Sequence, residues 1–98
     1  MDIRINHEGS KLTLELSGRL DTKTAPQLEN VLDTQLDGVT ELVLDFAGVE
    51  YISSAGLRIL LKAQKLMNRQ GSMLIRCVNE GVSDVLKITG FSNIFTIE

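Results

Sequence analysis

The chain has 98 residues, 43% of them hydrophobic and 23% charged, and this length predicts one compact domain over residues 1–98. Its single cysteine excludes an internal disulfide and a thiolate metal cluster, and favours a reducing, cytoplasmic location. The formal net charge of −3 gives no electrostatic reason to expect nucleic-acid binding, and no apolar run approaches the roughly 20 residues that a membrane span requires.

The first third of the chain predicts a hairpin and a helix. Apolar and polar residues alternate over 3–5 and 12–16, which indicates two half-buried strands. The segment His7–Ser10 between them is typical of a hairpin turn. A helix follows, with Thr24 as its predicted N-cap and Gln27 completing a capping box.

The rest of the chain predicts strands and helices in alternation. The mostly apolar run Glu41–Asp45 indicates a short strand buried on both sides, and a loop is expected over 46–52. Three larger elements and an edge strand are expected after it: a helix from Ser54 to about Gln70, a strand over 73–78 with Cys77 as a core residue, a helix capped by Asn79 and ending near Thr89, and a short strand at 95–97. The order β-β-α-β-α-β-α predicts an α/β fold, a mixed four- to five-stranded sheet with helices packed against it.

Two hydroxyl groups, those of Ser53 and Ser54, stand where the longest helix begins. The first N–H groups of a helix have no intrahelical acceptor, and serine is a preferred cap for them. The same unpaired N–H groups and partial positive charge stabilise a phosphate. From the residues alone, a capping role and a modified or anion-binding hydroxyl remain equal alternatives.

The long helix has an apolar face and a basic one. The residues expected to face the sheet are Ile59, Leu60, Ala63, Leu66 and Met67. On the opposite side lies a basic stripe formed by Arg58, Lys62, Lys65 and Arg69. A stripe of this kind is usually a solvated helix face, and the alternative is that it engages an acidic partner. Leu57 and Leu61 fall at the border, where exposed leucines ringed by charge would form a binding hot spot.

Groups suited to catalysis or metal binding are few. The only histidine, His7, falls in the predicted turn, and Ile52 stands where a Gly-x-Ser-x-Gly elbow would need its first glycine. Asp21, Asp45 and Glu50 could converge at one end of the sheet to hold a divalent cation, although such carboxylates are more often solvated. The sequence therefore predicts no catalytic residue, no metal and no cofactor.

Two segments resemble the STAS domain family, the anti-sigma factor antagonists. The longer is Leu44-Asp45-Phe46-Ala47-Gly48-Val49-Glu50-Tyr51-Ile52-Ser53-Ser54-Ala55-Gly56-Leu57, and the shorter is Gly18-Arg19-Leu20-Asp21. The predicted order of elements fits that family along nearly the whole chain. The resemblance implies regulation by partner switching: the unphosphorylated protein binds an anti-sigma factor that is also a serine kinase, phosphorylation breaks the complex, and a phosphatase restores it.

The same resemblance places the phosphoacceptor at Ser54, two residues before Gly56. The acidic residue usual before the acceptor is Ser53 here, and the hydroxyl residue usual after it is Ala55. Ser53 therefore remains the alternative acceptor. The expected partner-binding residues are Asp21, Ser53, Ser54, Gly56, Leu57, Arg58, Leu61 and Lys62.

The first hypothesis is a cytoplasmic, non-enzymatic switch protein that binds an anti-sigma factor/serine kinase and no nucleic acid. The second is a non-switching subunit of a lipid-transport or signalling complex with the same fold, in which Ser54 only caps a helix. The third and weakest is a small enzyme or ligand-binding protein that uses Asp21, Asp45 and Ser54.

Overall fold

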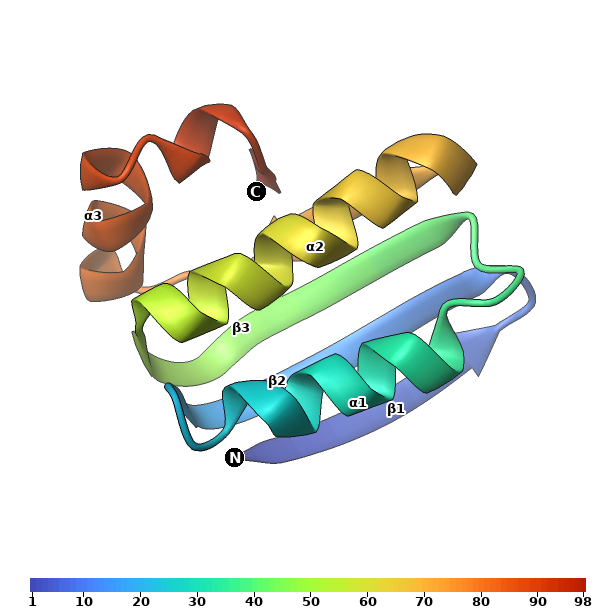
Figure 1. The fold of residues 1–98 in the computed structure, drawn as a ribbon, viewed down its shortest axis with the longest axis horizontal. Helices are drawn as coiled ribbons and strands as arrows, with labels where there is room; N and C mark the ends of the chain where they lie inside the picture. Colours follow the sequence, from blue (N-terminus) through green and yellow to red (C-terminus); the bar gives the residue numbers. More distant parts are fainter.

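The computed structural model describes residues 1–98 as a five-stranded mixed sheet with three α-helices (Figure 1). The strands, in sheet order, are β1 (Asp2–Glu8), β2 (Lys11–Leu20), β3 (Glu41–Ile52), β4 (Ser72–Arg76) and β5 (Thr96–Ile97). The helices are α1 (Ala25–Gln35), α2 (Ser54–Gln70) and α3 (Glu80–Ile88), followed by a 3-10 turn, η1 (Phe91–Asn93). Strand β1 is antiparallel to β2 and every other pair is parallel, which confirms the predicted α/β fold.

One face of the sheet carries the core. Helices α1 and α2 lie side by side across that face, and α3 lies near the start of α2, on the side away from α1 (Figure 1). In β2 the alternating residues Leu12, Leu14 and Leu16 are buried beneath the helices, as the period-2 pattern predicts. The opposite face has no helix over it, which leaves the side chains that point that way outside the core. No helix of the chain is both long and apolar enough to cross a membrane.

The central strand β3 is more than twice as long as expected. The prediction of a loop over 46–52 is wrong, because those residues continue to pair with β2. Two register shifts, between Glu15 and Ser17 and between Gly18 and Arg19, let the pairing resume as far as Leu20 and Ile52. These irregularities break the alternation of apolar and polar residues that would have identified a strand.

Two single residues also differ from expectation. The turn between β1 and β2 is only Gly9–Ser10, so His7 lies in β1, where its Nε2 hydrogen-bonds the Gln35 Oε1 at the end of α1 (2.8 Å). Cys77 is exposed and not part of the core, because β4 ends one residue earlier. Its φ of 62° turns the chain from β4 toward α3.

Helix α2 begins and ends where the sequence predicts. It ends at Gly71, where only glycine fits, because a Cβ there would lie 1.8 Å from the Thr40 carbonyl oxygen. Its faces are rotated slightly from the prediction: Leu57 is only 5% exposed, whereas Leu66, expected against the sheet, is 40% exposed. Leu66 instead lines a hollow between α1 and α2.

Candidate functional site

The two serines at the start of α2 have different environments. The Ser53 N–H donates to the Leu20 carbonyl at the end of β2 (2.9 Å). The Ser53 hydroxyl accepts a long hydrogen bond from the Gly56 N–H (3.5 Å), so Ser53 is the N-cap of α2. Ser54 is the first residue of the helix, is exposed, and its hydroxyl has no partner within the chain. One serine is thus structural and the other is free.

Gly56 holds α2 close to the ends of β2 and β3. It is buried, and a Cβ at this position would lie 2.7 Å from Leu20 Cγ and 3.0 Å from Ile52 Cγ1. Any side chain would therefore push the first turn of α2 away from the sheet. Gly56 positions Ser54 without contacting anything outside the chain.

The turn before α1 is closed by its own side chains. The Asp21 N–H donates to Thr24 Oγ1 (2.9 Å), while the Asp21 carboxylate accepts from the N–H groups of Lys23 (3.0 Å) and Thr24 (3.2 Å). The predicted Thr24–Gln27 capping box is wrong, since Gln27 Nε2 donates instead to the Met1 carbonyl. Partial desolvation raises the pKa of Asp21, but the donated hydrogen bonds outweigh it and lower that pKa below its ordinary value.

Arg19 and Tyr51 form an exposed pair beside this turn. The Arg19 guanidinium carbon lies 4.2 Å from the centre of the Tyr51 ring, and Arg19 Nε is 3.5 Å from Asp21 Oδ2. The two residues are neighbours in the register of β2 and β3. Sequence reasoning missed both, because they become neighbours only when residues 46–52 are part of a strand.

A groove opens next to Ser54, between α2 and the segment from α3 to η1. Its volume is about 360 Å³, and its lining residues are Ser54, Leu57, Arg58, Leu61, Thr89 and Phe91. Leu61 is half-buried and Leu57 buried, so the expected pair of exposed leucines is wrong for Leu57. Thr89 and Phe91 were not predicted from the sequence, which gives no signal that the last helix approaches Ser54.

The far wall of the groove is held by Asn79. Its Oδ1 accepts from the Val82 N–H (2.8 Å), which confirms it as the cap of α3. Its Nδ2 donates to the Val49 carbonyl of β3 (2.9 Å). The Phe91 ring stacks on Phe95 with 5.5 Å between ring centres. These contacts fix α3 and η1 relative to the sheet, and so fix the width of the groove.

The basic stripe of α2 is exposed as predicted, but its members differ. Lys62 Nζ lies 3.0 Å from Glu29 Oε2 and 3.3 Å from Asp33 Oδ1, and hydrogen bonds to these two α1 carboxylates raise the pKa of Lys62. Arg58, in contrast, forms no ion pair and lines the groove. The structure therefore brings Arg58 to Ser54 and ties Lys62 to α1, away from the groove.

The carboxylates expected to converge do not meet. Asp45 Oδ2 binds Arg76 Nε (3.2 Å) within the sheet, and Asp21 is tied into its own turn. Nowhere in the chain do three His, Cys, Asp or Glu side chains gather in a way that could hold a metal ion. The features that do come together near Ser54 are a free hydroxyl, an apolar groove and an unpaired arginine.

The STAS domain family matches residues 2–98, and the chain belongs to it. Among curated relatives, BtrV of Bordetella bronchiseptica, a proposed anti-sigma factor antagonist, is 40% identical over 84 residues, covering 84% of this chain and 72% of that one. The anti-sigma F factor antagonist of Paenibacillus polymyxa is 28% identical over 100 residues, covering 99% and 86% respectively.

Solved structures show the same fold. The unphosphorylated form of the anti-sigma factor antagonist SpoIIAA superposes with a TM-score of 0.85 at 16% identity, over 99% of this chain and 88% of that one. The phosphorylated form, from Bacillus, superposes with a TM-score of 0.77 at 15% identity, over 99% and 91%. The fold expected from the sequence is confirmed over nearly the whole chain.

Proposed function

We propose that this STAS domain protein is an anti-sigma factor antagonist that acts by binding an anti-sigma factor, with Ser54 as its switch. The observation that carries the proposal is the exposed Ser54 hydroxyl, which has no partner in the chain and adjoins an apolar groove. The names of the relatives, BtrV and the anti-sigma F factor antagonist, support the choice of partner.

The bound partner is a serine kinase as well as an anti-sigma factor, and both proteins are cytoplasmic. It binds the unphosphorylated chain through Asp21, Leu57, Arg58 and Leu61, beside the helix start that Gly56 positions, and transfers the γ-phosphate of ATP to the Ser54 hydroxyl. A serine phosphatase resets the switch. Ser53 is a poorer acceptor, because its hydroxyl already caps α2.

Phosphate at Ser54 is compatible with the fold. It adds roughly −1.5 to −2 charges at the N-terminus of α2, where free N–H groups and the helix dipole stabilise an anion. Arg58, one turn along the helix, is free to add a charge-assisted hydrogen bond. A partner surface made for a neutral hydroxyl has no such compensation, so phosphorylation acts on association. SpoIIAA has this fold in both its phosphorylated and its unphosphorylated form.

Binding, and not catalysis, is the activity that Ser54 supports. A serine nucleophile needs a neighbouring base. The one histidine, His7, is hydrogen-bonded to Gln35 at the C-terminal end of α1, whereas Ser54 lies at the opposite end of the helix layer (Figure 1).

The test is incubation with the anti-sigma factor kinase and ATP, followed by mapping of the phosphate by mass spectrometry. We expect phosphate on Ser54, none on a Ser54→Ala variant, and normal uptake by the matched Ser53→Ala variant. Phosphorylated protein should lose most of its affinity for the kinase in a calorimetric titration. Tight binding with no phosphorylation would favour the non-switching subunit instead, and phosphate on Ser53 would overturn the choice of acceptor.

A further inference from the structure

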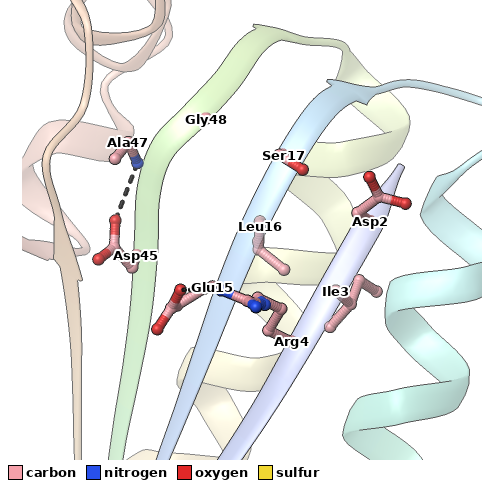
Figure 2. Close-up of a pocket in the computed structure, with 9 residues that line it drawn as sticks. All are labelled: Asp2, Ile3, Arg4, Glu15, Leu16, Ser17, Asp45, Ala47 and Gly48. Atoms are coloured by element: carbon pink, nitrogen blue, oxygen red, sulfur yellow. Dashed lines mark hydrogen bonds and ion pairs between the residues drawn. The ribbon is translucent and has the colours of Figure 1, made fainter.

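The face of the sheet that has no helix over it carries a row of charged side chains. Arg4, Glu15, Asp45 and Arg76 lie in register on four neighbouring strands, β1 to β4. Figure 2 views the sheet from this helix-free face, with the helices behind the strands and the side chains of Arg4 and Glu15 in front. We call these four residues the charged row. It lies on the side of the sheet opposite α1 and α2.

Beside the charged row the sheet is hollowed by an irregularity of its own backbone. The hollow has a volume of about 600 Å³ and is open to solvent. It lies where β3 bulges against β2, at the register shift between Glu15 and Ser17. Small residues line it at this point: Ser17, Ala47 and Gly48. Gly48 has no room for a side chain, because a Cβ there would lie 2.6 Å from the Ser17 Cβ.

The charge around the hollow is unbalanced. Three carboxylates, those of Asp2, Glu15 and Asp45, and one guanidinium, that of Arg4, line it, so negative charges outnumber positive ones. Only Asp45 has a close cationic partner, Arg76 at 3.2 Å. Arg4 Nη1 lies 3.9 Å from Glu15 Oε2, at the limit of an ion pair, and the Arg4 side chain is 83% exposed. A cation brought from outside can therefore approach Glu15 with little competition.

A second copy of this chain is a poor occupant of the face. The charged row has the sign order plus, minus, minus, plus, which is the same in either direction. If two copies stacked these faces about a two-fold axis along the row or along the strands, like charges would lie opposite each other throughout. Like charges opposed across an interface are strongly unfavourable.

We infer that the helix-free face is a second protein-docking surface, whose hollow receives an arginine or lysine side chain of a partner protein. The inserted cation binds Glu15 and Asp2, displaces Arg4 toward solvent, and rests against the small residues of the bulge. Because α2 and its groove lie on the other side of the sheet, a partner on this face and an anti-sigma factor at Ser54 can bind together. The surface makes the chain an adaptor between two proteins.

The test uses a blocked peptide, acetyl-Gly-Arg-Val-Arg-Gly-amide, titrated into the full chain and followed by amide chemical shifts. We expect shifts confined to residues 2–4, 15–17 and 45–48. A peptide with glutamate in place of arginine should produce none. The inference is overturned if no localised shift occurs at about 10 mM peptide, because a weaker affinity than this is too low for a docking site.

Two matched pairs of variants separate a specific site from general attraction. Glu15→Gln and Glu41→Gln remove the same charge from the same face, and Glu41 belongs to another row of the sheet. We expect Glu15→Gln to lower the affinity for the arginine peptide about fivefold, and Glu41→Gln to lower it by less than about 1.5-fold. Arg4→Ala removes the competing cation and should strengthen binding about twofold, whereas Lys11→Ala should not. Equal effects within each pair would show attraction by net charge alone and overturn the site.

Discussion

The first turns of α1 and α2 differ in how their polar groups are hydrogen-bonded, although both helices begin at the carboxyl ends of parallel strands. At α1, Asp21 and Thr24 exchange hydrogen bonds between 2.9 and 3.2 Å, so the turn is complete in itself. At α2, the Ser53 cap is long, 3.5 Å, and the Ser54 hydroxyl is unused. We call the start of α1 closed, because its polar groups are paired within the chain, and the start of α2 open. A closed start stabilises the fold, whereas an open one leaves N–H donors and a hydroxyl available to a ligand or partner.

The largest effect is expected where the open start is held against the sheet. Gly56→Val should destabilise the fold by about 2–3 kcal/mol, because even the Cβ of the new side chain would lie only 2.7 Å from Leu20 Cγ. Urea unfolding followed by circular dichroism measures the change.

The matched control is the other helical glycine, Gly81 in α3, where an added Cβ would make only an ordinary contact, 3.5 Å from Asn79 Oδ1. Gly81→Ala should raise stability by up to about 1 kcal/mol through helix propensity. A Gly56→Val protein as stable as the native one would show that close packing does not hold the start of α2.

The next effect concerns the groove beside Ser54. Leu61→Ala should weaken binding to the anti-sigma factor by more than about 1 kcal/mol, because it removes an apolar wall at the centre of the proposed contact. Leu66→Ala is the control, since Leu66 is 40% exposed on the same helix but outside this groove. Calorimetric titration of both variants with the anti-sigma factor measures the two affinities. Equal losses would place the contact elsewhere on α2, and a drop in stability of about 2–5 kcal/mol for Leu61→Ala would make it a core residue.

The closed and open helix starts should also differ in how much their capping side chains contribute to the free energy of unfolding. Thr24→Ala removes the acceptor of the Asp21 N–H and a hydroxyl that donates to the Arg19 carbonyl (2.6 Å), so we expect a loss of about 1–2 kcal/mol. Ser53→Ala removes only the 3.5 Å cap and should cost about 0.5 kcal/mol. Chemical denaturation of the two variants compares them directly, and a reversed order would contradict the distinction drawn between the two turns.

The smallest effect is a pH dependence confined to the closed start. The folded-state pKa of Asp21 is lowered by the hydrogen bonds donated to its carboxylate. Its stabilising contribution is therefore complete above the unfolded pKa of about 4 and is lost as the pH falls through the folded value. Asp21→Asn should therefore reduce the fall in melting temperature that accompanies a fall in pH below about 4. Asp37→Asn, at an exposed carboxylate outside any such turn, should leave that fall in melting temperature unchanged.

Most elements were predictable because local chemistry specifies them. The Ser53 cap and Gly71 define α2 within the sequence itself, and the leucines of β2 alternate with polar residues along most of the strand. The second half of β3 was not predictable. Its pairing with β2 passes through bulges, which destroy the period of two on which strand prediction depends.

Only the residues of the candidate site that belong to α2 were predictable from the sequence. Ser54, Leu57, Arg58 and Leu61 lie within two turns of α2, and helical periodicity places them on neighbouring faces. Thr89 and Phe91 arrive from a distant part of the chain, and only tertiary packing brings them there. Cys77 shows the same limit, because the turn that exposes it depends on where α3 must start.

The origin of the far wall has a consequence for when the protein can first act. Chains are synthesised from the N-terminus and fold progressively as they emerge. Ser54 and α2 are made well before Phe91, and the wall depends on the hydrogen bond from Asn79 to the Val49 carbonyl and on the stacking of Phe91 on Phe95. A nascent chain thus carries the hydroxyl before it carries the groove. A partner that needs both sides of the groove can therefore bind only after η1 has packed against the sheet.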